Sequence, residues 1–271
     1  MARRQVIPDA MPASKDALRA YWAKVAERAL PYLGNRLLNP VRHVKGETFY
    51  HTGPLPPIPR AVHRHSIRKS DGTEGIRVWV DSLDGLLGLV EMDFVEIHPW
   101  HATVDDIEHP DLLAFDLDPD EAIDYAFVVE TALRLRELLK ADGYRAWPKL
   151  TGRRDLHVMA PIGRTFTHDQ ARQYCKSIVA KICAINPSRY TLAAVKDARP
   201  GKLYLDYLRN GRGTTTLGVY SPRAVKGAPI AKEVTWKQLE QGIPLDAFTM
   251  NQPFKRRASS VPKRRGSASP G

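Results

Sequence analysis

The sequence predicts an α/β chain in which a mixed β-sheet is flanked by helices. Segments with the period of a strand alternate with segments with the period of a helix, and no repeat of fixed length accompanies them. Apolar residues make up 43% of the 271 residues, which is enough to bury a substantial core. No apolar run approaches the length of about 18 residues that a membrane span needs, so a membrane span is excluded.

An N-terminal helix is predicted over residues 15–33. Ser14 precedes it as an N-cap and Gly34 follows it as a stop. Apolar side chains recur on one side of this segment, at Leu18, Tyr21, Trp22, Val25, Ala29 and Leu33. This spacing predicts an amphipathic helix with that side buried.

The next part of the chain is predicted to form short strands around one helix. Branched and aromatic residues favour strands, and the prolines of GPLPPIP exclude that stretch from a central strand or a helix. In order, we expect short strands within 36–50, a proline connector at 53–59, a strand at 76–80, a short helix at 81–92 and a strand at 94–98.

Strands and helices interleave again in the second half of the chain. Pro119 is expected to end one strand, and Asp142 with Gly143 to end the helix that follows it. We expect strands at 112–118, 156–162 and 202–208, a helix at 120–141 and a helix from 167 to about 184.

Composition divides the chain into three parts. We expect an arm at 1–13, a folded domain at 14–250 and a basic tail at 251–271. The tail reads KRRASSVPKRRGSASPG from residue 255 and has too few apolar residues to fold, so it is predicted to be disordered.

The chain is strongly basic, with 41 Lys plus Arg against 30 Asp plus Glu and a net charge of +11. This charge favours a polyanionic partner, with nucleic acid first and an acidic membrane surface second. No apolar stretch of signal-peptide length follows the start of the chain, so a cytoplasmic, nucleoid-associated location is expected. Cys175 and Cys183 are too few for a disulfide framework and are predicted to be reduced core residues.

Acidic residues inside apolar strands are the sharpest chemical feature. Asp116 and Asp118 are two apart in the predicted strand and therefore share a face, where two nearby carboxylates repel each other unless a cation lies between them. Asp206 is a third acid, in the apolar segment LYLDY. All-oxygen ligands favour Mg²⁺ or Mn²⁺ over zinc, so these acids predict a two-metal site for phosphoryl transfer chemistry.

Basic side chains near these acids are suited to bind a triphosphate, because guanidinium groups donate paired hydrogen bonds to phosphate oxygens. The candidates are Arg153, Arg154, His157, Lys202, Arg209, Arg212 and Arg223.

Several motifs together resemble the polymerase domain of bacterial ATP-dependent DNA ligase D, within the archaeo-eukaryotic primase superfamily. The matching segments are EIHPW (96–100), DDIEHPD (105–111), AFDLDP (114–119), LHVMAPI (156–162) and RPGKLYLDYLRNGRGTTTLGVYSPR (199–223). The similarity extends from about residue 14 to residue 248. It implies a primase-type mixed sheet flanked by helices, with an N-terminal subregion of helices and strands.

The resemblance also implies an activity and a set of site residues. It implies extension of DNA ends or filling of gaps from nucleoside triphosphates in double-strand break repair by non-homologous end joining, with two Mn²⁺ or Mg²⁺ ions held by Asp116, Asp118 and Asp206. It places His157, Arg223 and His98 at nucleotide-binding positions, with Thr151, Gly152 and Arg154 in the motif before the His157 strand. Partners implied are gapped or overhanging DNA, the Ku end-binding protein and a separate DNA ligase.

The chain departs from the family pattern at three places. Asp155 replaces a glycine next to the expected phosphate site, and Thr52 replaces a lysine. In the family's pocket for a downstream 5′-phosphate, Lys15 matches and Arg3 or Arg4 are substitutes for a second lysine.

Two other interpretations remain open from the sequence. One is a non-catalytic DNA-binding relative of the same fold, which the departures at Asp155 and Thr52 allow. The other is a phosphohydrolase with an aspartate nucleophile, because FDLDP superficially resembles such a DxD motif.

Overall fold

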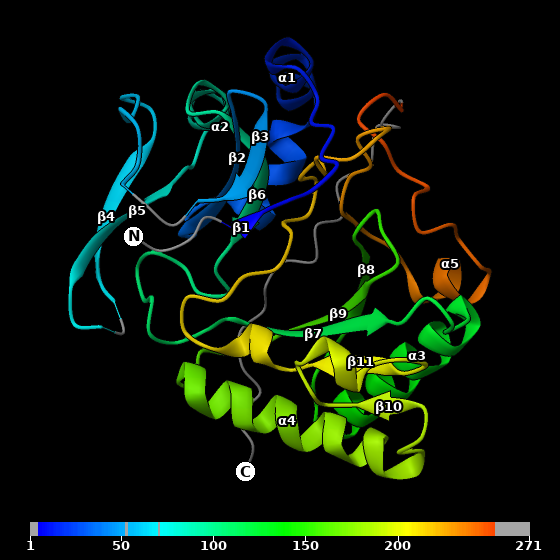
Figure 1. Cartoon of the computed structure of the whole chain (residues 1–271). Coiled ribbons are helices and arrows are strands. Elements are labelled where there is room, and N and C mark those ends of the chain that lie inside the picture. The colour runs from blue at the N-terminus through cyan, green and yellow to red at the C-terminus, as the bar shows by residue number, and fades with distance from the viewer. Residues whose placement is uncertain (1–4, 52–53, 70, 253–271) are drawn as a thin grey trace.

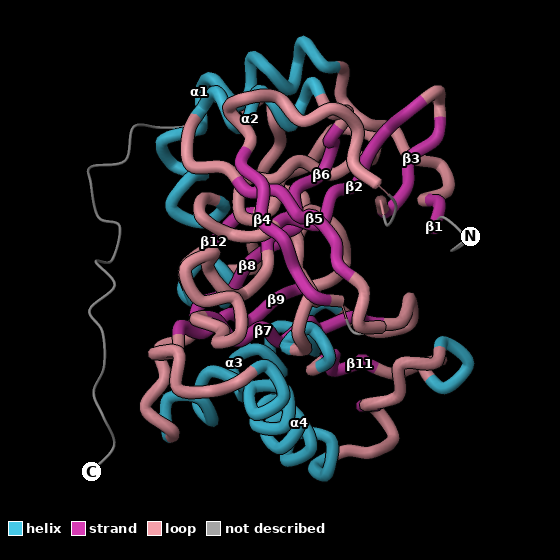
Figure 2. The backbone as a smooth tube through the Cα atoms, turned by 90° about the vertical axis from the view of Figure 1, so that its left-hand side faces the viewer, coloured by secondary structure: helices cyan, strands magenta, loops and turns pink. Residues whose placement is uncertain are grey.

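The computed structural model describes residues 5–51, 54–69 and 71–252. These residues form two β-sheets that lie between two pairs of helices, α1 with α2 on one side and α3 with α4 on the other (Figures 1 and 2). The predicted mixed α/β class is confirmed.

The first sheet has the strand order β1-β3-β2-β5-β4, and β6 pairs with β2. Its strands are β1 (Gln5–Val6), β2 (Leu38–Val44), β3 (Glu47–Tyr50), β4 (His63–Arg68), β5 (Glu74–Trp79) and β6 (Phe94–Pro99). All the pairings in this sheet are antiparallel. Strand β1 lies in the expected N-terminal arm and attaches that arm to β3.

The second sheet has the order β10-β11-β7-β9-β8-β12. Its strands are β7 (Leu112–Pro119), β8 (Trp147–Leu150), β9 (Leu156–Pro161), β10 (Tyr190–Thr191), β11 (Leu203–Asp206) and β12 (Lys232–Glu233). The pairings of β7 with β11 and β9 are antiparallel, and β10 pairs in parallel with β11.

The helices begin at residues whose side chains cap them. The helices are α1 (Lys15–Leu33), α2 (Leu83–Glu91), α3 (Tyr125–Ala141), α4 (His168–Ile185) and α5 (Trp236–Glu240), with short 3₁₀ turns η1 (Lys196–Ala198) and η2 (Leu208–Asn210). The predicted cap of α1 is confirmed, since Ser14 Oγ accepts from the Ala17 N–H, and the six apolar residues predicted to face the core are buried. Thr167 caps α4 with a reciprocal bond to Gln170.

The expected start of the helix after β7 was wrong by five residues. Asp120 caps a turn instead, because its Oδ1 accepts from the Ala122 N–H, and α3 begins only after its own N-cap, Asp124. The end of β7, the strand that carries Asp116, is therefore followed by a turn and not directly by a helix. Strands β4 and β8, which have weak patterns, were not predicted from the sequence, and neither were the two-residue strands β1, β10 and β12 (Lys232–Glu233).

Each sheet presents apolar side chains to its own pair of helices. In β7, Leu113, Phe115 and Leu117 belong to the core shared with α3 and α4, and the alternate residues point to the other face. Strand β6 likewise contributes Phe94 and Ile97 to the core with α1 and α2. The polar residues between these apolar ones are left on the inner faces of the two sheets, where the candidate site lies.

Three further expectations concern the cysteines, a membrane span and the basic tail. Cys175 is buried, Cys183 is partly buried, and both are free thiols. Across the described ranges, no helix combines the length and the apolar character needed to cross a membrane. The expected disordered tail lies, from residue 253 on, outside the described residues.

His101 gives the fold a sensitivity to acid. Its imidazole is buried after β6, with Nε2 3.1 Å from Thr216 Oγ1, and burial together with the charges of Lys149 and Arg36 holds its pKa well below the ordinary value of 6.5. Unfolded His101 binds a proton below that pH while the folded residue stays neutral. The free energy of unfolding should therefore fall by about 1.4 kcal/mol per pH unit below 6.5 from this residue.

We accordingly expect His101→Gln to show a shallower loss of stability with acid than the wild type. Urea unfolding at a series of pH values from about 7 to about 5 measures this difference in slope. Parallel stability curves for the two proteins would show that His101 titrates normally.

Candidate active site

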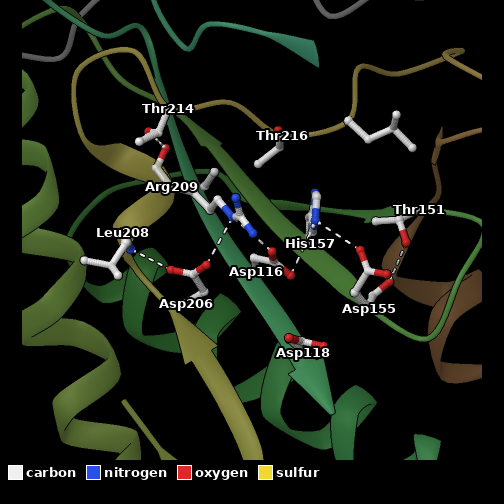
Figure 3. A network of polar contacts seen from close by, with 12 residues as sticks. Asp116, Asp118, Thr151, Asp155, His157, Asp206, Leu208, Arg209, Thr214 and Thr216 are labelled. Atoms are coloured by element: carbon white, nitrogen blue, oxygen red, sulfur yellow. Dashed lines mark hydrogen bonds and ion pairs between the residues drawn. The ribbon is translucent and has the colours of Figure 1, made fainter. Parts of the chain in front are cut away.

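A row of ionisable residues crosses the inner face of the second sheet. Asp206 of β11 is paired with Asp116 of β7, Asp116 with His157 of β9, and His157 with Lys149 of β8. Residues directly opposite in neighbouring strands share a face of a sheet, so the four side chains lie side by side. Figure 3 shows Asp206, Asp116 and His157 in this order.

Asp116 lies at the centre of the row, and its two carboxylate oxygens face different neighbours. Oδ2 accepts from Arg209 Nε at 3.3 Å, and Oδ1 lies 3.5 Å from His157 Nε2. Within the described ranges, Oδ1 is buried and accepts no hydrogen bond. Burial alone would raise the pKa of Asp116, but the opposing interactions with His157 and Arg209 outweigh burial and lower it.

Asp206 is the last residue of β11, where the chain enters η2. Its Oδ1 accepts from the Leu208 N–H at 2.8 Å, and its Oδ2 lies 3.1 Å from Arg209 Nε. Arg209 is therefore shared between Asp206 and Asp116, as Figure 3 shows. Burial and the negative charge of Asp116 raise the pKa of Asp206, although Arg209 opposes this shift.

Asp118 shares the inner face with Asp116 but lies nearer the end of β7. Its side chain is about half exposed (48%), and its Oδ2 accepts from Arg199 Nη1 at 2.8 Å. Partial burial and the charges of Asp116 and Asp155 raise the pKa of Asp118. The three predicted aspartates thus lie on one face of two adjacent strands, with Asp118 and Asp206 each bound to an arginine.

Lys149 was not identified from the sequence. It is 2% exposed, and its Nζ donates to Thr216 Oγ1 and to the Leu217 carbonyl, which holds the 216–217 segment against the sheet. Burial lowers the pKa of this ammonium to about 7. The available signal was a lysine between Pro148 and Leu150, just before the Thr151 motif.

Thr151 and Gly152 fix the conformation of the loop at 151–155. Thr151 Oγ1 donates to the Asp155 carbonyl at 3.0 Å. Gly152 has a φ of +77°, and a Cβ there would approach Pro229 Cβ at 2.7 Å, so only glycine fits. Arg154 points to the turn after β7, where its Nη2 donates to carbonyls of residues 120, 121 and 123.

Asp155 extends the row toward a potential metal position. Asp116, Asp155 and His157 each offer one ligand atom, and these atoms all lie within 4.8 Å of one another. Asp116 and His157 are buried, Asp155 is partly buried, and the group can hold a metal ion. Burial would raise the pKa of Asp155, but the hydrogen bond with His157 and the charge of Arg223 hold it well below its usual range. The three aspartates named from the sequence do not themselves form such a group.

The opposite wall of the site comes from the first sheet and from the segment near residue 223. His98 of β6 is buried, and its Nε2 lies 2.9 Å from Glu96 Oε2. Glu96 Oε1 accepts from the Ala224 N–H at 2.8 Å, so Glu96, which was not identified from the sequence, holds both His98 and the backbone beside Arg223. Arg223 Nη2 lies 3.8 Å from Asp155 Oδ1, and its buried Nε donates no hydrogen bond to any described residue.

Other basic residues named from the sequence are directed elsewhere. Lys202 Nζ donates to the Pro187 carbonyl, and Arg212 binds Glu108 and the Arg68 carbonyl. Lys15, in the first turn of α1, pairs with Asp93 at 2.7 Å. Arg3, Arg4 and Thr52 lie outside the described residues.

A family profile for the LigD primase-polymerase domain matches residues 14–262. The multifunctional non-homologous end joining protein LigD of Pseudomonas aeruginosa is 30% identical over 242 residues, which is 88% of this chain and 28% of that protein. The bifunctional LigD of Bacillus subtilis is 26% identical over 242 residues, 88% of this chain and 39% of that protein. The chain therefore spans well under half the length of these relatives.

The fold resembles that of a solved structure. That structure is the polymerase domain of Mycobacterium tuberculosis ligase D in complex with DNA, which matches with a TM-score of 0.75 and 24% identity over 83% of this chain and 82% of that one. At this identity, the likeness supports the fold.

Proposed function

We propose, from the premise that this chain belongs to the LigD primase-polymerase family, that it is a nucleotidyltransferase that adds ribo- or deoxynucleotides to a DNA primer strand. We assign this activity to the repair of double-strand breaks by non-homologous end joining, since the LigD relatives are named for that process. Gapped or overhanging DNA, Ku and a separate ligase are the proposed partners. The supporting observation is the row of Asp206, Asp116 and His157 on one inner face of the sheet.

Asp116, Asp118 and Asp206 are the proposed ligands of the catalytic ions, Mn²⁺ or Mg²⁺. Their donor set fits such ions, because all three offer carboxylate oxygens and lie on one face of the adjacent strands β7 and β11. Two bound ions supply a lowered pKa for the attacking primer hydroxyl and neutralise the charge that develops on the phosphoryl group. In this structure Arg209 and Arg199 neutralise the same carboxylates.

Arg223 is the proposed principal ligand of the incoming triphosphate. Its side chain is 13% exposed, and its nearest acidic atom, Asp155 Oδ1, is beyond hydrogen-bond distance at 3.8 Å. A buried guanidinium with an unused N–H favours an anionic ligand, and phosphate oxygens match its paired donors. Thr151 and Gly152 shape the adjoining loop, whereas Arg154, Lys202 and His98 have protein partners in this state.

The activity is tested by primer extension on gapped and overhanging DNA, with ribo- and deoxynucleotides and with Mg²⁺ or Mn²⁺. We expect template-directed addition that requires the divalent ion. DNA binding without any incorporation in Mn²⁺ would instead identify a non-catalytic relative. A phosphorylated Asp116 trapped during turnover would identify the phosphohydrolase alternative.

Arg223→Ala is expected to raise the KM for nucleoside triphosphate by about tenfold or more, because a charge-assisted hydrogen bond to phosphate contributes about 1.5–3 kcal/mol. Steady-state extension at varied nucleotide concentration measures the change. Arg164→Ala is the matched control, since Arg164 forms an exposed pair with Asp105. An unchanged KM in Arg223→Ala would remove this residue from the nucleotide site.

A further inference from the structure

On the side of Asp116 that faces His157, the available ligand atoms include a nitrogen. Asp116, Asp118 and Asp206 together offer only carboxylate oxygens. Asp116 Oδ1, His157 Nε2 and Asp155 Oδ2 converge from β7, β9 and the loop before β9, as Figure 3 shows. His157 Nε2 lies 3.5 Å from the first oxygen and 3.4 Å from the second. Ligand atoms that share one ion at bonds of about 2.1 Å are separated by about 3.0–3.5 Å, so both distances match one coordination shell.

Two of the three side chains are buried, and one of the donor atoms, Asp116 Oδ1, has no hydrogen-bond partner among the described residues. The Asp116 and His157 side chains are 9% and 4% exposed. Asp116 Oδ1 and His157 Nδ1 are among the buried atoms that make no hydrogen bond to any residue the structure describes. A buried carboxylate oxygen without a hydrogen bond is costly, and the ring nitrogen Nε2 of His157 lies 3.5 Å from this one.

Nearby cations do not fill this position. Arg209 is on the other side of Asp116, where it contacts Oδ2 and Asp206. Arg223 approaches the other oxygen of Asp155, Oδ1, at 3.8 Å. The Oδ2 atom of Asp155 and the Oδ1 atom of Asp116 both remain directed at His157 Nε2.

We infer that Asp116, Asp155 and His157 form an additional cation position, which binds a divalent transition-metal ion such as Mn²⁺ in preference to Mg²⁺. Asp116 is shared between this position and the ions assigned to Asp118 and Asp206. The inference therefore deepens the proposed function, and the sharing of Asp116 rests on that function. His157 Nε2 is thereby assigned to the cation.

The preference for a transition metal follows from the imidazole nitrogen. Mg²⁺ favours oxygen ligands and retains its water molecules, whereas Mn²⁺ and Zn²⁺ accept mixed nitrogen and oxygen ligands. Asp155 supplies the second carboxylate of the set. A glycine at that position, as in the family pattern, offers no ligand there.

The test measures metal binding to the purified full chain without DNA or nucleotide. Titration with Mn²⁺, followed by electron paramagnetic resonance, is expected to detect a site from which Mg²⁺ at equal concentration does not displace Mn²⁺. Pulsed measurements should detect coupling of the bound Mn²⁺ to an imidazole nitrogen. Asp155→Asn should weaken this site by about tenfold or more, and His157→Gln should abolish the nitrogen coupling.

Two controls separate this site from its surroundings. Asp118→Asn should retain the nitrogen-coupled Mn²⁺, because Asp118 is bound to Arg199 and is not part of the group. Asp105→Asn alters an exposed carboxylate elsewhere and should leave binding unchanged. Circular dichroism of the metal-free variants establishes that each is folded.

Unchanged Mn²⁺ affinity in a folded Asp155→Asn variant would overturn the inference, and so would bound Mn²⁺ without nitrogen coupling in the wild type. Because the measurement contains no DNA, its result is independent of primer extension. A chain that binds Mn²⁺ through His157 but extends no primer would refute the proposed function and retain the cation site.

Discussion

Asp116→Asn is expected to lower the rate of primer extension by about 10³-fold or more. Asp116 has neighbours on both sides of its carboxylate, Arg209 with Asp206 on one side and His157 with Asp155 on the other. Loss of metal-based charge stabilisation costs several kcal/mol in the transition state, and each 1.4 kcal/mol corresponds to about tenfold in rate. Single-turnover extension in Mn²⁺ measures the effect.

Asparagine keeps the shape of the side chain, so the variant should remain folded and should still bind DNA. Thermal unfolding and a DNA-binding titration check both points, and Asp105→Asn is the matched control for an aspartate outside the site. Extension by Asp116→Asn within about tenfold of the wild-type rate would be incompatible with a catalytic centre at Asp116.

Arg36→Ala is expected to lower the free energy of unfolding by about 3–5 kcal/mol. The Arg36 side chain is 1% exposed, and its two Nη atoms donate to the two oxygens of Asp111 at 2.7 and 2.6 Å. Removal of the guanidinium leaves the Asp111 carboxylate buried next to the start of β7. Because Arg36 follows α1 and Asp111 precedes β7, this pair links the two halves of the fold. Urea unfolding monitored by circular dichroism measures the loss.

Two comparisons identify the cause of that loss. Asp105→Ala breaks the exposed pair with Arg164 and should cost about 1 kcal/mol or less. The double variant Arg36→Met with Asp111→Leu removes both charges and should recover much of the stability lost in Arg36→Ala. Equal losses of unfolding free energy in Arg36→Ala and Asp105→Ala would show that breaking the buried ion pair costs no more than breaking the exposed one.

Helix ends were predicted well where one capping residue was unambiguous. Ser14 and Gly34 bound α1 as expected, and Thr167 caps α4. The start of α3 was misplaced because residues 120–124 contain two aspartates that can each cap backbone N–H groups. In the folded chain, Asp124 caps α3. Arg154, in the loop at 151–155, donates to the carbonyls of Glu121 and Ile123 in the turn before this helix.

Strands β4 and β8 were missed for a different reason. The β4 sequence HRHSIR has one fully buried residue, and β8 contains a proline and the buried Lys149. Neither sequence has the alternation of apolar and polar residues that is typical of a half-buried strand. Pairing with β5 in one case and with β9 in the other stabilises them.

Alternation along each strand was sufficient to place Asp116 and Asp118 on one face, because successive side chains of a strand point to opposite faces. Register between strands is a property of the folded sheet, and it put Asp206 and His157 beside Asp116. The loop conformation at 151–155 then brought Asp155 to His157. Long side chains such as Arg154, Lys202 and Lys15 took partners from remote segments, because flexible side chains bind whichever groups the folded chain brings within reach.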